Sequence, residues 1–171
     1  MREYIVELFN EKRHNISKFS CGVEDLDNYL KQQVNQDTKR KVTVLYIIRK
    51  AKSKEVIGYY TISSNSIELT NLPESVTKKL PRYKSLPAIL IGRLAVHIRN
   101  QGKGIGEHLL INALVRSYEL SKKVGCFAVV VDAKDKRSSD FYEKYGFIKI
   151  KNIPLKLFIP ILTVKRLFDK N

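Results

Sequence analysis

The sequence predicts an α/β fold, which some schemes class as α+β, built on a central mixed β-sheet. A nearly continuous apolar run over 89–96 is typical of a strand that is buried on both faces of a sheet. Apolar residues then recur at helical spacing over 104–123, and a second apolar run follows at 127–132. These segments form a β-α-β unit, so we expect the two strands to be parallel and their crossover to be right-handed.

The N-terminal part of the chain supplies further strands and one helix. Leu26, Leu30 and Val34 recur every four residues and predict a helix over 23–34, with acidic residues in its first turn as the helix dipole prefers. A polar segment separates two stretches rich in β-branched and aromatic residues, which indicates a hairpin. The strands predicted in this part are 3–9, 42–49 and 56–67.

Prolines and glycines mark the ends of the other elements. Gly125 is expected to end the long helix, Pro81 a short helix, and Gly146 the last helix. Pro160 is expected to turn part of the final apolar run into an edge or a bulge. The remaining predicted elements are two helices, 75–80 and 136–145, and two closing strands, 147–151 and 157–164.

The length and composition are those of an ordinary globular domain. The chain has 171 residues, of which 43% are hydrophobic, and it shows no repeat or linker. We therefore expect a single domain over 1–171. Cys21 and Cys126 have no Cys/His cluster at metal spacing beside them, so we interpret both as reduced thiols of a cytoplasmic protein that needs no metal. The charged N-terminal segment MREYIVELFNEKRH is unlike a signal peptide or a membrane span.

The charge balance points to a polyanionic partner. The chain has 32 Lys and Arg against 17 Asp and Glu, a formal net charge of +15. Such a surplus favours contacts with phosphates that weaken as salt rises. A lysine-rich but merely solvated surface is the alternative, also for the basic link Lys39-Arg40-Lys41. No RNA-recognition signature of interleaved aromatic and basic residues is present, so we expect any nucleic-acid contact to depend on charge and shape.

A glycine-rich turn links the strand at 89–96 to the following helix. Its sequence is Gln-Gly-Lys-Gly-Ile-Gly over 101–106. Glycines allow main-chain N–H groups to approach a ligand closely, and the helix N-terminus attracts negative charge, so the turn suits a diphosphate. A plain strand-to-helix connection is the alternative. The spacing is neither that of a Walker loop nor that of the dinucleotide fingerprint.

The turn matches the pattern Gln/Arg-x-x-Gly-x-Gly/Ala, with Gln101, Gly104 and Gly106 at its defined positions. This is the signature of the GNAT superfamily of N-acetyltransferases, which the chain resembles. Further segments are similar, in the same order, to the GNAT toxins of toxin–antitoxin pairs. They are Phe19–Gly22, Leu26-Asp27, Tyr29-Leu30, Gly92–Val96, Val129–Ala133, Phe141–Phe147 and Leu157-Phe158.

The resemblance implies a GNAT fold: a mixed sheet of six or seven strands with about four helices, in which two parallel strands splay apart to form a slot for acetyl-CoA. It also implies a reaction, in which acetyl-CoA acetylates the α-amino group of aminoacyl-tRNA and translation is blocked. The partners implied are aminoacyl-tRNA, a ribbon-helix-helix antitoxin that neutralises the enzyme, and a second copy of the chain in a homodimer.

Site residues follow from the same resemblance. Tyr142 matches the catalytic tyrosine of Phe-Tyr-x-x-Tyr/Phe-Gly-Phe, and Arg93 is the candidate contact to the tRNA end, with a structural ion pair as its alternative. The slot is expected between Arg93–Val96 and Val130–Ala133. The residues expected to bind acetyl-CoA are Leu94, Ala95, Val96, Gln101, Gly102, Lys103, Gly104, Ile105, Gly106 and Glu107.

The chemistry of the amine indicates how much base catalysis is needed. A lysine amine has a pKa near ~10.4, whereas an α-amino group lies near ~7.7–8.0 and is deprotonated far more readily. No carboxylate pair lies in the motif region, and an aminoacyl ester would not require one. The leaving thiolate still needs a proton donor, for which Tyr142 is the candidate. We expect His14, His97, His108, Tyr145 and Phe147 to be packing or surface residues and Cys126 to be a poor nucleophile.

Two other functions stay open on the sequence. One is a GNAT acetyltransferase of a small amine or a protein N-terminus. The other is an inactive binding module that has kept the fold. The intact glycine turn and Tyr142 argue against an inactive module, and the positive charge argues against a cationic amine as substrate because like charges repel.

Overall fold

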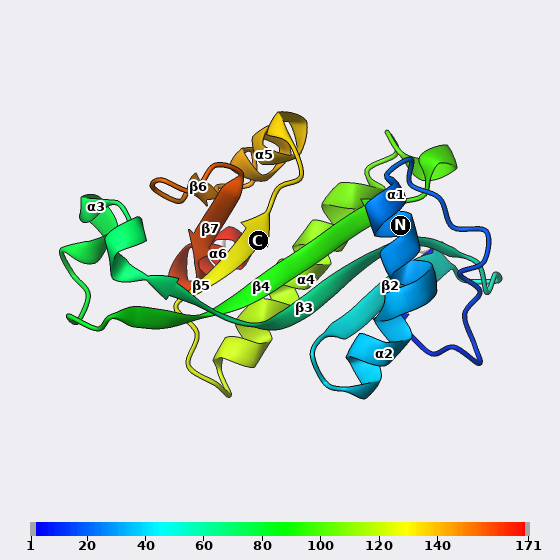
Figure 1. Ribbon diagram of the computed structural model, residues 1–171, viewed down its shortest axis with the longest axis horizontal. Coiled ribbons are helices and arrows are strands. Elements are labelled where there is room, and N and C mark those ends of the chain that lie inside the picture. The colour runs from blue at the N-terminus through cyan, green and yellow to red at the C-terminus, as the bar shows by residue number, and fades with distance from the viewer. Residues whose placement is uncertain (1–2, 170–171) are drawn as a thin grey trace. The chain divides into compact units, whose positions relative to one another are not determined.

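The computed structural model describes residues 3–169 of the chain (Figure 1). Within these residues, seven strands form one mixed sheet in the order β1-β2-β3-β4-β5-β7-β6. The chain divides into two compact units, Met1–Ser63 with Gly92–Ala113 and Ser64–Ile91 with Leu114–Asn171. The expectation of one domain over 1–171 stays a prediction, and its ends at 1–2 and 170–171 lie outside the described residues.

Three elements run through both units because they cross a unit boundary: β3 (Val56–Glu68), β4 (Ser85–Val96) and α4 (Ile105–Ser121). The other elements of the first unit are β1 (Tyr4–Leu8), α1 (Glu24–Asn28), η1 (Tyr29–Gln33), α2 (Val34–Lys39), β2 (Val44–Lys50) and η3 (Ile98–Asn100). Those of the second are η2 (Leu69–Asn71), α3 (Glu74–Thr77), β5 (Ala128–Asp132), α5 (Lys136–Glu143), β6 (Ile148–Lys149), β7 (Lys156–Pro160) and α6 (Ile161–Phe168).

In the first unit, helical segments cover both faces of an antiparallel sheet. Strand β2 pairs with β1 and β3, so the predicted hairpin is confirmed. Leu30 and Val34 are fully buried against Leu45 and Ile47 of β2, which places α1 to α2 on one face. On the other face, Leu109 of α4 lies against β3.

The helix predicted over 23–34 is longer and less regular than its pattern suggests. It continues to Lys39, and its middle turn η1 is a π-helix rather than an α-helix. Apolar spacing could not predict this turn, because Leu26, Leu30 and Val34 are compatible with an unbroken α-helix. Such π-turns are rare and are found often at functional sites.

The second unit contains the parallel pair that the β-α-β pattern predicts. Strand β4 pairs in parallel with β5 from Ala88–Ala128 to Ile91–Val131. Strand β7 pairs antiparallel with β5 and with the short β6. The core here packs Val130 and Phe158 of the sheet against Leu72 and Ile150.

One predicted strand is wrong over its second half. The run 157–164 is a strand only to Pro160, and α6 begins at Ile161. Proline has no N–H for the sheet ladder, so the strand ends there instead of becoming a bulge. Ile161 and Val164 are buried three residues apart, which is helical spacing. Smaller shifts affect α4, which ends at Ser121 before Gly125, and α3, which is shorter than 75–80.

Among the described residues, no helix is both long enough and apolar enough to cross a membrane. Residues 3–169 also contain no group of three or more His, Cys, Asp or Glu side chains that could hold a metal ion.

Candidate active site

The glycine turn lies in the first unit between the end of β4 and the start of α4. His97 precedes the turn, and its Nδ1 accepts a hydrogen bond of 3.2 Å from the N–H of Arg99. Gly102 and Gly104 have φ values of +74° and +76°, which favour glycine strongly. Apart from the glycine and its two neighbours in the chain, no atom lies within 4 Å of where a Cβ would be at either position. A side chain at either position would therefore point into open space, and its absence leaves the main chain accessible there.

The side chains of two predicted acetyl-CoA contacts are directed to the protein itself. Gln101 Nε2 donates to the carbonyls of Cys21 at 2.8 Å and Val96 at 2.9 Å. Lys103 Nζ donates to the Arg99 carbonyl at 2.8 Å. What these residues offer a diphosphate is their main chain. The first N–H groups of α4 add to this, because they have no partner inside the helix.

Asp27 of α1 completes the support of this turn. Its carboxylate accepts from the N–H of Cys21 at 2.8 Å and from the hydroxyl of Ser20 at 2.9 Å. Burial alone would raise the pKa of Asp27, but the hydrogen bonds from Cys21 and Ser20 outweigh it and lower the pKa. Cys21 is thus bound through its N–H by α1 and through its carbonyl by Gln101, which fixes the loop against the turn.

Arg93 stacks on an aromatic ring. Its guanidinium carbon lies 3.5 Å from the centroid of the Tyr29 ring, and its backbone N–H donates to Thr61 Oγ1 at 3.0 Å. The ion pair considered as an alternative is not found among the described residues, where Arg93 faces π-electrons instead of a carboxylate. A stacked guanidinium keeps its N–H groups in a fixed plane, available to a phosphate.

The Tyr29 hydroxyl beside Arg93 is buried and has no hydrogen-bond partner within residues 3–169. Burial raises the pKa of Tyr29 to about 12, against the opposing effect of the Arg93 charge. Tyr29 opens the π-turn η1, so the helical irregularity lies at the residue that supports Arg93.

Tyr142 belongs to the second unit, where α5 carries it. Asp135 caps this helix and accepts from the N–H of Ser138 at 2.7 Å. Tyr142 is 6% exposed, and its ring lies 5.5 Å from the Phe147 ring, centroid to centroid. Burial, and then the negative charge of Asp132, raise the pKa of Tyr142 well above its usual range. The hydroxyl is therefore protonated at neutral pH and can act as a hydrogen-bond donor.

The roles of the other predicted residues stay predictions. Leu94, Ala95 and Val96 form the end of β4, while Ile105, Gly106 and Glu107 form the first turn of α4. The slot predicted between Arg93–Val96 and Val130–Ala133 would involve both units and also stays a prediction.

Several residues that the sequence analysis did not assign to catalysis make packing or hydrogen-bond contacts within the protein. His97 packs edge-on against Phe19, and His14 is buried with its ring next to Glu7. Both cysteines are free thiols. Burial raises the pKa of Cys21 to about 11 and also raises that of Cys126, which makes both poor nucleophiles at neutral pH.

Gly58 of β3 was not singled out from the sequence. A Cβ there would lie 2.9 Å from Ile48 Cγ2, 2.9 Å from Leu109 Cδ1 and 3.1 Å from the Ala95 carbonyl oxygen. The glycine lets α4, which carries the turn, lie close to the sheet. An isolated glycine inside a strand rich in β-branched and aromatic residues was the available signal.

Comparison with known proteins identifies the family. The model of the acetyltransferase (GNAT) domain matches residues 43–149, which is more than half of the chain. The chain belongs to the GNAT acetyltransferases. The resemblance seen in the glycine turn and the expected fold are confirmed, and this N-acetyltransferase is an enzyme of the acyltransferase class.

Several GNAT proteins are similar to this chain over nearly its full length. The chain is 31% identical over 170 residues to a protein of Sinorhizobium fredii described as probable toxin TacT, covering 95% of this chain and 94% of that one. A solved tyrosine-to-phenylalanine mutant of KacT has a TM-score of 0.91 at 28% identity, covering 97% and 99% of the two chains. AtaT complexed with acetyl-methionyl-tRNAfMet has a TM-score of 0.89 at 29% identity, covering 97% and 99%. AtaT has also been solved with the C-terminus of the antitoxin AtaR.

Proposed function

We propose that this GNAT enzyme is a toxin that transfers the acetyl group of acetyl-CoA to the α-amino group of aminoacyl-tRNA and so blocks translation. One observation carries the proposal. AtaT, which resembles this chain over nearly its full length, has been solved with an acetylated aminoacyl-tRNA. The net charge of +15 supports a polyanionic substrate over a cationic amine.

The glycine turn fits the acyl donor. Acetyl-CoA supplies an activated thioester and a diphosphate. Gly102 and Gly104 have left-handed backbones and open space where a side chain would lie, which would let the main chain of the turn approach an anion closely. Gln101 and Asp27 hold the turn through Cys21, so this backbone is positioned before a ligand arrives. Preorganised donors of this kind cost no rearrangement when the ligand binds.

The reaction forms one C–N bond and breaks one C–S bond. The α-amino nitrogen attacks the thioester carbonyl carbon, loses a proton, and the thiolate of coenzyme A departs. Because an α-amino group has a pKa near ~7.7–8.0, a useful fraction is neutral at physiological pH, and no dedicated carboxylate base is needed.

Tyr142 would donate a hydrogen bond to the departing thiolate. Its raised pKa keeps the hydroxyl protonated, so the donor is always present. A thiol has a pKa near ~8.5, so full proton transfer from tyrosine is uphill, and stabilisation of the developing negative charge is the larger contribution. Arg93, fixed on the Tyr29 ring, is the proposed contact to the phosphate at the tRNA end.

The partners follow from the proposed reaction. Charged tRNA is used in the cytoplasm, which is where the enzyme would act. A toxin of this kind requires an antitoxin, and we propose one of the ribbon-helix-helix class. A homodimer and a single catalytic domain over 1–171 complete the proposal. A small neighbouring gene of the antitoxin type would support it.

Acetyl transfer onto charged tRNA tests the function directly. Purified enzyme, radiolabelled acetyl-CoA and pools of aminoacylated or deacylated tRNA are incubated together. Label should appear only on the aminoacylated pool and should leave with the amino acid on mild alkaline hydrolysis of the ester. Equal labelling of both pools, or acetylation of free amines alone, would overturn the proposal.

A further inference from the structure

A cluster of basic side chains lies in the first unit, on loops other than the glycine turn. A hollow of about 460 Å³ is formed by the loop before Asn15 and the turn between β2 and β3. No carboxylate lines this basic hollow. Five of its eight lining residues carry a permanent positive charge: Lys12, Arg13, Arg49, Lys52 and Lys54.

Backbone hydrogen bonds hold the two loops side by side. The N–H of Asn15 donates to the Lys54 carbonyl at 2.8 Å, and the N–H of Val56 donates to the Asn15 carbonyl at 3.0 Å. Lysines that are 40 residues apart in the sequence, such as Lys12 and Lys52, therefore line one hollow. The arrangement comes from the fold and is not a local run of charge.

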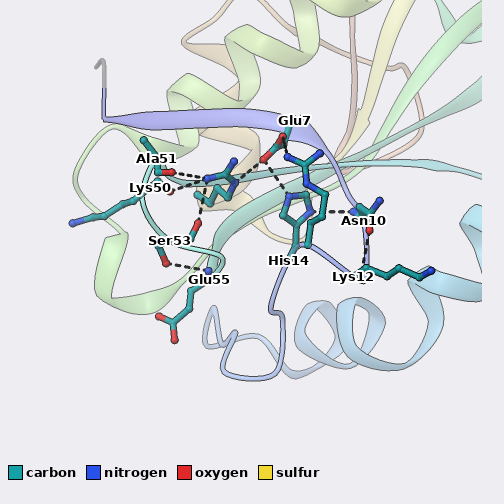
Figure 2. A network of polar contacts seen from close by, with 10 residues as sticks. Glu7, Asn10, Lys12, His14, Lys50, Ala51, Ser53 and Glu55 are labelled. Carbon is teal, nitrogen blue, oxygen red and sulfur yellow. Dashed lines mark hydrogen bonds and ion pairs between the residues drawn. The ribbon is translucent and has the colours of Figure 1, made fainter.

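Arg49 fixes the shape of the turn from the inside. Its Nη1 donates to the carbonyls of Lys50 at 3.2 Å, Ala51 at 2.9 Å and Ser53 at 3.2 Å (Figure 2). Its Nε donates to Glu7 Oε1 at 2.6 Å, and its side chain is only 14% exposed. Arg49 is thus a structural cation that holds the backbone of the turn in one conformation.

Glu7 is occupied by this inner network. His14 Nδ1 accepts from the N–H of Asn10 at 3.0 Å, so its Nε2 carries the proton and lies 3.1 Å from Glu7 Oε1 (Figure 2). Arg13 lies farther from the second Glu7 oxygen, at 3.9 Å. Burial would raise the pKa of Glu7, but the hydrogen bonds from Arg49 and His14 outweigh it and lower the pKa. The carboxylate is ionised and committed to the inner residues.

Three exposed lysines of the hollow have no ion-pair partner among the described residues. Within residues 3–169, no carboxylate pairs with Lys12, Lys52 or Lys54, and all three are exposed. Neighbouring lysines differ, since Lys18 pairs with Glu55 at 3.4 Å and Lys50 with Glu3 at 3.6 Å. Like charges held together destabilise the free protein unless an anion binds them.

We propose that the basic hollow binds the phosphodiester backbone of the tRNA substrate, away from the reacting amine. Several cations on a rigid, open surface suit a chain of phosphates, whereas a single small anion would be held by fewer and more enclosed donors. The proposal rests on the proposed function. It assigns the hollow to holding and orienting the tRNA body, and it places none of these lysines in the chemical step.

The test removes the three outer lysines together as Lys12→Gln, Lys52→Gln and Lys54→Gln. Binding of labelled, uncharged tRNA is measured by fluorescence anisotropy over a range of salt concentrations. Each lost phosphate contact lowers the slope of log affinity against log salt by ~0.7–0.9, so three contacts lower it by about 2–3. Between about 50 and 200 mM salt, the parent should then lose about 20- to 40-fold more affinity than the variant.

A matched control removes the same charge elsewhere. It replaces three exposed lysines of the second unit: Lys123, Lys151 and Lys165. We expect this control to keep the parent's salt slope, and both variants to keep the parent's KM for acetyl-CoA. A hollow variant that behaves like the control would overturn the proposal. So would a loss of affinity confined to duplex DNA of similar length, because the hollow would then not serve tRNA.

The outcome is separable from that of the proposed function. If the parent acetylates charged tRNA and only the hollow variant raises the KM for tRNA, the proposal stands. If the parent acetylates charged tRNA and the hollow variant keeps the parent KM, the function stands and the hollow assignment is wrong. If the parent fails to acetylate charged tRNA, the proposed function is wrong, and the anisotropy comparison still decides whether the hollow binds tRNA.

Discussion

Gly104→Val should separate the stability of the glycine turn from its use as a ligand site. Gly104 has φ = +76°, and apart from its chain neighbours nothing lies within 4 Å of an added Cβ, so backbone strain is the main cost of the substitution to the folded protein. That cost is about 1–3 kcal/mol, which lowers the Tm of a chain of this size by about 2–12 °C. In the proposed site, the valine side chain would occupy this open space and obstruct the approach of the diphosphate to the main chain. Loss of one charge-assisted hydrogen bond, worth about 1.5–3 kcal/mol, weakens acetyl-CoA binding by about 10- to 150-fold.

The assay combines titration calorimetry of acetyl-CoA with thermal unfolding of the same samples. Gly146→Val is the matched control, because Gly146 has φ = +89° and lies in the second unit. Both variants should lose similar stability, and only Gly104→Val should lose affinity. A folded Gly104→Val protein that binds acetyl-CoA as tightly as the parent would refute the assignment of the turn. Equal loss of affinity in both variants would attribute the effect to strain.

Three further changes test other parts of the structure. Tyr142→Phe should lower turnover on charged tRNA by ~10²–10⁴-fold with little change in acetyl-CoA affinity, and a turnover within a few fold of the parent would remove Tyr142 from the mechanism. Gly58→Ala should lower stability by about 1–3 kcal/mol through overpacking, measured by urea unfolding; an unchanged midpoint would contradict the close approach of α4. The pKa of Glu7 is lower in the folded protein than the 4.5 of the unfolded chain, so ionised Glu7 stabilises the fold at pH values above 4.5. This stabilisation is lost as the pH falls through the folded-state pKa. Glu7→Gln should therefore flatten the acid limb of a plot of Tm against pH, and an unaltered limb would show that the bonds from Arg49 and His14 contribute nothing.

The elements with a clear period were predictable from the sequence. The runs that became β4 and β5 are continuous and apolar because both faces are covered, and the helical pattern between them required a parallel crossover. The strand expected beyond Pro160 was wrong because β-branched and leucine residues suit both states over a short run. The segment is a helix in which Ile161 and Val164 are buried on one face, and that burial depends on residues distant in the sequence.

The site was predictable as a motif, but not in how its side chains are used. The pattern located Gln101, yet only the structure shows that its amide binds the Cys21 carbonyl, 80 residues away in sequence. The stacking of Arg93 on Tyr29 could not be predicted from the sequence either, because a contact between residues far apart in the chain leaves no periodic pattern. The basic hollow was visible only as a net charge, because its lysines come from two separate loops.

The division of the chain into interleaved segments has a consequence for its biosynthesis. The first unit is formed by Met1–Ser63 and Gly92–Ala113, so it cannot be completed until fifty further residues, 64–113, have left the ribosome. At about 5–20 residues per second this takes about 3–10 s, during which β1, β2 and the start of β3 lack the strand and helix that cover them. Tyr142 is synthesised later still. A nascent chain of this enzyme thus passes through a period in which it exposes apolar surface that the rest of the first unit covers in the folded protein, and in which Tyr142, the proposed catalytic residue, is not yet part of the chain.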